Sequence, residues 1–211
     1  MLQAIDLACQ RGERLLFRAL AFTLGPGECL HVAGENGAGK TSLLRLLAGL
    51  LVPAAGRIEW DGRDIRRLHE EFWSTLAYVG HANGVKDELT AVENLRFGNA
   101  IAGRPADDAA ARAALGLLGL QDHADRPVRA LSQGQRRRVA LARLAGAAGA
   151  RLWILDDPFT ALDARGIEVL RELVAGQGYV LVRGQHDAAA APQLPGAVRR
   201  LELVATTGSA A

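Results

Sequence analysis

Cysteine is scarce in this sequence of 211 residues, which contains only Cys9 and Cys29. Two cysteines are too few for a disulfide framework, and their spacing matches no metal-binding motif. We therefore expect both to be small core residues in a reducing compartment. Long hydrophobic stretches are also missing: no run of about eighteen apolar residues occurs, so the sequence predicts no membrane-spanning helix. The first residues, MLQAIDLACQRGE, lack the basic and apolar regions of a signal peptide, which favours the cytosol.

Strong net charge is absent as well, because 25 basic and 23 acidic residues leave a formal charge of +2. A charge this small does not predict binding to nucleic acid or to an anionic membrane surface. The hydrophobic fraction of 49% and the charged fraction of 23% are those of a soluble globular protein. The length suits a single core, or a core with one insertion.

Lysine is almost absent from the sequence. Lys40 and Lys86 are the only two among the 25 basic residues, so the remainder, 25 − 2 = 23, are arginines. Such a chain is expected to keep lysine where it matters. Codon bias together with chance is an equally good explanation for Lys86.

The first third of the chain alternates short apolar stretches with turns. Residues 4–9 and 15–24 flank the turn-like QRGER and predict an antiparallel pair of strands. After a Gly-Pro-Gly turn, residues 29–33 predict a buried strand, and leucines at helical spacing in residues 43–50 predict a helix. A glycine-rich segment therefore lies between a strand and a helix, which is the context of a phosphate-binding loop.

This segment, GENGAGKTS, has the spacing Gly-x4-Gly-Lys-Thr of a phosphate loop. Glycines let the backbone curl so that successive N–H groups point inward, and the helix N-terminus adds partial positive charge. Lys40 is expected to supply a compact charge for the outer phosphates, and the Thr41 hydroxyl is a candidate ligand for Mg²⁺. The candidates for nucleotide binding are Gly34, Glu35, Asn36, Gly37, Ala38, Gly39, Lys40, Thr41 and Ser42. An ordinary glycine-rich turn is the alternative, and the predicted strand and helix around the loop count against it.

The middle of the chain changes from short strands to helices. Residues 51–64 predict a loop, a short strand and a turn, and residues 76–79 predict another short strand. Helical spacing and charge dominate residues 85–130, which we interpret as a helical insertion. We expect a single domain in which residues 1–84 and 131–211 form an α/β core with an N-terminal antiparallel β subdomain.

A second glycine-containing segment, LSQGQ at residues 131–135, precedes another predicted helix. We name it the signature segment. Ser132 is placed to cap the helix at its N-terminus, which again favours an anion. The segment is weak evidence alone and gains weight from its position between the phosphate loop and an acidic strand. The three arginines that follow, residues 136–138, are interpreted as a solvated helix face near nucleotide rather than a nucleic-acid site.

Two adjacent aspartates follow the apolar strand predicted at residues 152–155. Asp156 has the position at which a P-loop fold holds Mg²⁺, directly or through water. Asp157 is placed to orient and polarise an attacking water. Residues 178–183 predict a further strand that leads to His186. A lone histidine is usually structural, but one at a strand end in this order is expected to contact the terminal phosphate.

The series GENGAGKTS, LSQGQ, LWILDDP, ALD and His186 resembles the ATP-binding subunits of ABC transporters over nearly the whole chain. The resemblance implies a P-loop ABC-type α/β fold that binds ATP and Mg²⁺ and hydrolyses ATP to ADP and phosphate. In that family the signature segment of one subunit closes over ATP held by the other. The resemblance therefore implies a head-to-tail dimer in which Ser132, Gly134 and Gln135 act in trans. It also implies a membrane permease, to which the helical insertion transmits the closing and opening of the dimer.

Finer features resemble the ATPase subunit of the haem-exporter-like cytochrome c maturation system. These are YVGHANGVKDELTAVENL, RLLAGLLVPAAGRIEWDG and LWILDDPFTALD, with Gly80-His81 and Gly84-Val85-Lys86 as counterparts of a GH pair and a GIK-like triplet. The resemblance implies haem transport or handling at the cytoplasmic face of the inner membrane, with the chain bound peripherally to permease subunits. No histidine of the sequence belongs to an axial-ligand motif, so we identify no direct haem ligand.

Three residues depart from the ABC pattern. His81 stands where most of these ATPases have glutamine, and it is a further candidate for the Mg²⁺ sphere or its water. Arg11 lies about where an aromatic side chain stacks on adenine, and a guanidinium is a candidate for the same stacking. Asp157 replaces the glutamate that is the family's catalytic base. Its carboxylate is drawn back by roughly an ångström, a misplacement that lowers rates about a hundredfold, so we predict a slow but real ATPase.

Two other functions are compatible with the same residues. The chain could serve another exporter, of lipid, drug or polysaccharide, through a different permease, although the GH and GVK features count against this. It could instead be a soluble, slow-hydrolysing regulatory module that binds nucleotide, as Asp157 allows. Soluble ABC proteins that act on ribosomes usually carry two cassettes in one chain, and this chain has one.

Overall fold

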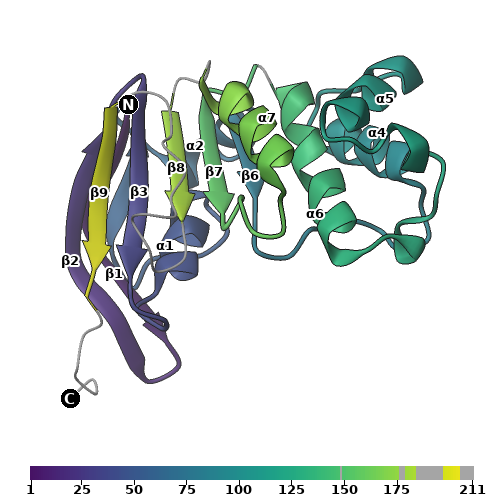
Figure 1. The fold of residues 1–211 in the computed structure, drawn as a ribbon. Coiled ribbons are helices and arrows are strands. Elements are labelled where there is room, and N and C mark those ends of the chain that lie inside the picture. Colours follow the sequence, from purple (N-terminus) through teal and green to yellow (C-terminus); the bar gives the residue numbers. More distant parts are fainter. Residues whose placement is uncertain (148, 176–178, 184–196, 205–211) are drawn as a thin grey trace.

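The computed structural model describes residues 1–147, 149–175, 179–183 and 197–204 (Figure 1). Within these ranges the chain forms two β-sheets and several helices, which confirms the predicted α/β class. No helix in the described ranges has the length and hydrophobicity needed to cross a membrane. Cys9 and Cys29 are buried free thiols, as predicted.

The antiparallel sheet predicted at the N-terminus is present, with the strand order β2-β1-β4-β5. Its strands are β1 (Leu2–Arg11), β2 (Arg14–Leu24), β4 (Ala55–Trp60) and β5 (Arg63–Asp64). Strand β4 is the short strand predicted within residues 51–64, and it pairs with β1. Gly56 permits this approach, because its φ is 79° and a Cβ there would collide with the backbone of Ile5 and Asp6.

A parallel sheet has the strand order β6-β7-β8-β3-β9. Its strands are β3 (Glu28–Gly34), β6 (Leu76–Val79), β7 (Leu152–Asp156), β8 (Tyr179–Arg183) and β9 (Ala197–Leu203). The sequence predicted all of these except β9. Because the paired strands run in the same direction, their carboxyl ends lie along one edge of the sheet, at the bottom of Figure 1.

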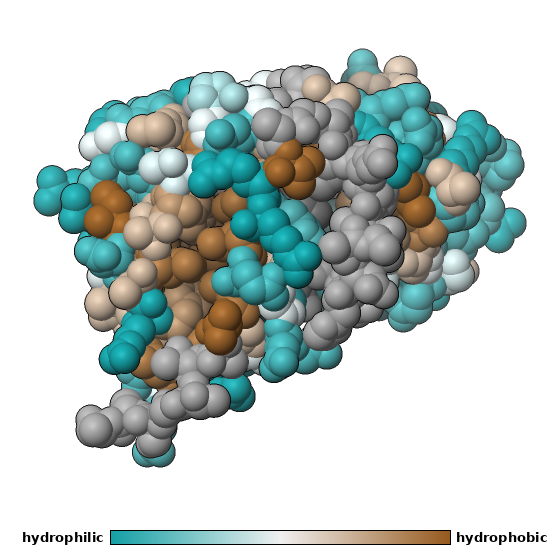
Figure 2. Space-filling view, turned by 60° about the vertical axis from the view of Figure 1, so that its left-hand side comes forward, coloured by the Kyte–Doolittle hydropathy of each residue, from teal (hydrophilic) through white to brown (hydrophobic). Residues whose placement is uncertain are grey.

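Strand β9 is an edge strand, and its composition differs from that of β7. Every residue of β7 is buried, as expected for a strand covered on both faces. In β9 the apolar residues are interrupted by Arg199, Arg200 and Glu202, and Val198 is 48% exposed. Charges of this kind are common on edge strands, where they discourage pairing with another chain. Figure 2 turns the side of β2 and β9 forward and shows hydrophobic side chains at the surface there.

Helix α1 (Lys40–Leu47) packs between the two sheets. Its leucines share a hydrophobic core with the antiparallel sheet and with Leu152 and Ile154 of β7. The alternate residues Trp153 and Leu155 point to the opposite face and join a second core, to which α7 (Ala164–Ala175) contributes. Two short helices, α2 (Ile65–Leu68) and α3 (Glu70–Ser74), connect β5 to β6. One face of β7 therefore packs in the core that contains α1, and the other face packs in the core that contains the helices that follow β6.

Residues 85–130 are largely helical, as predicted. They contain α4 (Ala91–Ile101), α5 (Asp108–Leu117) and two 3₁₀ turns (Gln121–His123 and Val128–Ala130). Helix α6 (Gln133–Ala142) and a 3₁₀ helix (Arg143–Ala147) then lead to β7. Leu95 of α4 and Leu115 of α5 belong to the same core as Trp153, so these helices and the sheet share one core. The boundaries of the helical subdomain stay a prediction.

Candidate nucleotide-binding site

Residues 34–42 form the loop between β3 and α1 that the sequence predicts. Gly34, Gly37 and Gly39 have φ angles of 132°, 85° and 97°, which side chains rarely adopt, so the curl of the loop depends on glycine. Gly39 is the N-cap of α1, no side chain caps the helix there, and the first turn contains no acidic residue. The helix N-terminus thus keeps its partial positive charge for an anion.

Lys40 points back over this loop. Its ammonium group donates hydrogen bonds to the carbonyl oxygens of Gly34, at 2.5 Å, and Glu35, at 2.8 Å. The residue is only 5% exposed. A positive charge is therefore held against the backbone of the phosphate loop.

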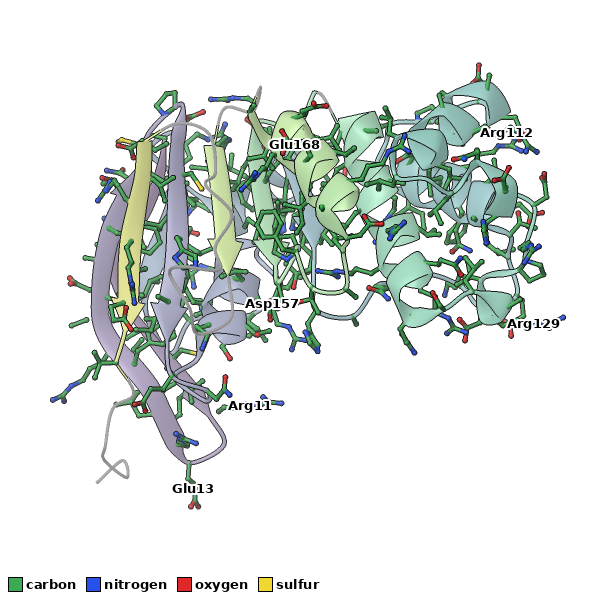
Figure 3. The ribbon with its side chains drawn as sticks, in the orientation of Figure 1. Arg11, Glu13, Arg112, Arg129, Asp157 and Glu168 are labelled. Atoms are coloured by element: carbon green, nitrogen blue, oxygen red, sulfur yellow. The ribbon has the colours of Figure 1, made fainter. Side chains whose placement is uncertain are left out.

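A pocket of about 290 Å³ opens beside the loop. Its lining consists of Arg11, Arg14, Leu16, Gly37, Gly39, Lys40, Thr41 and Ser42. Arg11 and Arg14 face each other across the β1–β2 turn, whose tip carries Glu13 (Figure 3). Both terminal nitrogens of Arg14 lie within 4 Å of the position that a Cβ on Gly37 would take. The sequence pattern indicates Arg11 but not Arg14, although the predicted hairpin places Arg14 opposite Arg11.

Asp156 ends β7 and is completely buried. In the sheet register it lies beside Arg183 of β8, which in turn lies beside Val32 of β3, two residues before Gly34. Because side chains alternate along a strand, the Asp156 carboxylate points to the face on which Ile154 packs near α1. Asp156 and the phosphate loop therefore lie at the same edge and on the same face of the sheet.

The pKa of Tyr78 in β6 is affected by the negative charge of Asp156. It packs against the core that contains α1, so it faces the same side as Asp156. Burial raises the pKa of the Tyr78 phenol, and the charge of Asp156 adds to the rise, whereas Arg45 opposes it. At neutral pH the phenol keeps its proton, because the ordinary pKa of tyrosine is already about 10.

Asp157 follows directly and begins the loop that leads to α7. Its φ is 50°, in the left-handed region, and it is 5% exposed. Figure 3 shows Asp157 near the ends of the strand arrows, with Arg11 below it toward the hairpin tip that carries Glu13. His81 lies in the loop after β6 and is exposed, next to Gly80. His186 lies outside the described residues.

The signature segment begins α6. Ser132 is the N-cap, as predicted: its hydroxyl oxygen accepts a hydrogen bond from the Gln135 N–H at 3.2 Å, and the Gln135 side chain accepts one from the Ser132 N–H at 2.9 Å. This reciprocal pair is a capping box, which fixes the start of the helix. Ser132 is exposed, and neither Ser132, Gly134 nor Gln135 lines the pocket beside the phosphate loop of the same chain.

The interpretation of residues 136–138 as a solvated helix face is wrong for the middle arginine. Arg136 and Arg138 are partly exposed and pair with Asp87 and Asp163. Arg137 is only 6% exposed, and its guanidinium donates to backbone carbonyls of two loops. The helical period places residue 137 on the inner face of α6, and a triple repeat of one residue type hides that periodicity.

The sequence pattern of the ABC transporter family matches residues 17–160. The chain belongs to the ABC transporter family. The ABC-type fold is confirmed by a dimeric ATP-binding cassette solved in a post-hydrolysis state with ADP and Pi. That structure has a TM-score of 0.80 and 24% identity, and the match covers 96% of each chain.

Within the ABC transporter family, two relatives carry the name cytochrome c biogenesis ATP-binding export protein CcmA. The protein from Aromatoleum aromaticum is 51% identical over 192 residues, which cover 89% of this chain and 90% of the relative. The protein from Salmonella typhimurium is 45% identical over 214 residues, which cover 100% of this chain and 99% of the relative. The predicted resemblance to the cytochrome c maturation ATPases is confirmed.

Proposed function

We propose that this chain binds and hydrolyses ATP as the ATPase subunit of an exporter in cytochrome c biogenesis. The observation that carries the proposal is the identity of 45% and 51%, over most of both chains, to proteins named for that export function. The phosphate loop supports it, because its backbone N–H groups, helix N-terminus and Lys40 are the features that hold a triphosphate.

The residues present fit a Mg²⁺ ion. Mg²⁺ prefers oxygen ligands and is usually held by one or two carboxylates together with phosphate oxygens. Thr41 and Asp156 are the residues that would hold it, with His81 as a further candidate. The described residues contain no cluster of three acidic or histidine ligands, and Mg²⁺ bound together with phosphates does not require one. When bound, Mg²⁺ supplies positive charge that offsets the charge of the phosphates.

The protein side of the reaction follows from the remaining residues. Asp157 orients and polarises the attacking water, and His186 contacts the terminal phosphate. Arg11 and Arg14 line the pocket, where they would bind the base, the ribose or a phosphate. Ser132, Gly134 and Gln135 close over ATP held by a second copy in a head-to-tail dimer, for which the exposure of Ser132 leaves room.

The partner of this dimer is a membrane permease, to which residues 85–130 pass the motion of closing and opening. The chain then sits peripherally at the cytoplasmic face of the inner membrane, and haem is handled by the membrane subunits. No part of the proposal requires a haem ligand or a nucleic acid on this chain.

Affinity purification from native membranes in mild detergent tests the assignment. A tagged copy of the full chain is purified, partner proteins are identified by mass spectrometry, and haem is measured by absorbance. We expect recovery of a small multi-spanning permease together with haem-binding maturation proteins. Recovery of another exporter's permease would keep the ATPase and discard the haem assignment, and recovery of the chain alone from the soluble fraction would contradict the transporter role.

The position of Arg14 predicts a role in nucleotide affinity. Arg14→Ala is expected to raise KM for ATP about tenfold with little change in kcat, because one charge-assisted hydrogen bond contributes about 1.5–3 kcal/mol. Arg18→Ala is the matched control, since Arg18 is exposed on the same strand and does not line the pocket. Steady-state ATPase assays measure both variants, and equal KM values for Arg14→Ala and Arg18→Ala would show that Arg14 does not contact the nucleotide.

A further inference from the structure

The side of α6 that faces the sheet holds the loops that follow β6 and β7. Arg137 donates from one terminal nitrogen to the carbonyl oxygen of Gly80 at 2.8 Å and to the Asn83 side chain at 3.3 Å. Its other terminal nitrogen donates to the carbonyl oxygens of Asp156 at 2.7 Å and Asp157 at 3.0 Å. A single buried guanidinium therefore connects the backbone of both loops.

The planar shape of arginine suits this arrangement. Its two terminal nitrogens form a rigid fork, whereas a lysine ammonium is a single point with rotating donors. Burial lowers the pKa of Arg137, and the carboxylates of Asp156 and Asp157 oppose the shift. The guanidinium stays charged at neutral pH, and the low polarity of its surroundings strengthens each of its hydrogen bonds.

The backbone at Asp157 needs such support. Its φ of 50° lies in the left-handed region, which few non-glycine residues adopt, although aspartate does so more readily than most. Such a conformation persists when surrounding contacts fix it. The hydrogen bond from Arg137 to the Asp157 carbonyl is a contact of this kind. It acts on the peptide that determines where the Asp157 carboxylate points.

Two further contacts hold the rest of this loop against the same helix. Arg138 forms an ion pair with Asp163 at 2.8 Å. A Cβ on Gly134 would lie 3.2 Å from the carbonyl oxygen of Ala161, so the first turn of α6 packs closely on the loop. The loop of residues 157–163 therefore packs along α6, the helix that begins with the signature segment.

We propose that Arg137 is a positioning residue that holds Asp157 of its own chain in place for hydrolysis and ties it to the signature helix α6. The inference rests on the proposed ATPase function and extends it. In the head-to-tail dimer the signature segment contacts the ATP of the partner, while Arg137, further along α6, holds the hydrolytic aspartate of its own site.

Steady-state kinetics of the full chain test the positioning role. Arg137→Gln is expected to lower kcat about a hundredfold, the effect of roughly an ångström of misplacement, with KM for ATP within about twofold. The kcat of Arg137→Lys is expected to be similarly low, because lysine keeps the positive charge but lacks the two-pronged guanidinium. The control is Arg143→Gln, which removes another largely buried arginine that donates to the Asn83 carbonyl but does not contact Asp157. If Arg143→Gln lowers kcat as much as Arg137→Gln at the same loss in Tm, the role of Arg137 is only structural.

Mixed dimers with two affinity tags separate action in cis from action in trans. Adding Arg137→Gln to the subunit that already carries Asp157→Asn is expected to leave the remaining activity unchanged, because the Asp157 of that subunit is already inactive. Placing Arg137→Gln in the other subunit is expected to lower the remaining activity about a hundredfold. The reverse pattern would show that Arg137 acts through the signature segment on the partner's ATP, and would overturn the proposal. The wild-type rate tests the proposed ATPase separately, since the inference depends on ratios between dimers.

Discussion

Replacing Lys40 with alanine is expected to lower kcat/KM for ATP hydrolysis by about a thousandfold, the scale of losing a preorganised charge at a reacting phosphate. The lysine is 5% exposed, and the carbonyl oxygens of Gly34 and Glu35 hold its ammonium group within the phosphate loop. No other lysine is near the pocket, because the second one, Lys86, lies in the loop before α4. The loss should appear both in nucleotide binding, measured by calorimetry, and in turnover.

Lys86→Ala is the matched control for this variant, since it removes the other lysine of the chain. Lys86 is exposed, and its contact with Asn94 is made by its backbone N–H, which alanine retains. Its ATPase rate is expected to stay within about twofold of wild type, as for most exposed substitutions away from a site. Equal losses in the two variants would contradict the special role of Lys40.

Asp157→Asn is expected to lower kcat about a thousandfold while ATP still binds, because an amide cannot polarise water as a carboxylate does. The change preserves size and is well tolerated at a φ of 50°, where asparagine is among the favoured residues. A loss in kcat without a change in Tm would therefore be chemical. Nucleotide affinity measured without Mg²⁺ should match that of wild type, and a comparable loss of affinity would argue against the assigned role.

Asp157→Glu tests whether the shorter carboxylate limits the rate. Moving the carboxylate forward by one methylene is expected to raise kcat, since misplacement of roughly an ångström lowers rates about a hundredfold. The left-handed backbone favours aspartate over glutamate, so the same variant is expected to lower Tm slightly. Unchanged or lower turnover would show that the length of this side chain does not limit the rate.

The features that the sequence predicts well are those encoded by neighbouring residues. The phosphate loop is one contiguous segment, and its glycines, Lys40 and flanking apolar runs all lie within about one strand and one helix. The cap formed by Ser132 and Gln135 is likewise local, three residues apart. Asp156 is recognised because it ends a strand whose other residues are all apolar.

The features that the sequence does not predict depend on residues brought together by the fold. Strand β9 has no continuous apolar run, because one side of this edge strand faces solvent. The position of Arg14 follows from its pairing with Arg11 and the approach of the hairpin to Gly37. The contacts of Arg137 join residues 57 and 20 positions away, at Gly80 and Asp157, and no local pattern encodes them.

Strand β3, which carries the phosphate loop, lies between β8 and β9, and both neighbours belong to residues 179–203. A Cβ on Gly34 would collide with the carbonyl of Leu203, so the last strand also closes against the first residue of the loop. During synthesis, about 170 residues must follow β3 before both of its partner strands exist, and contacts so distant in sequence form late. A nascent chain therefore carries the glycine-rich loop well before the two strands that flank β3 can pair with it.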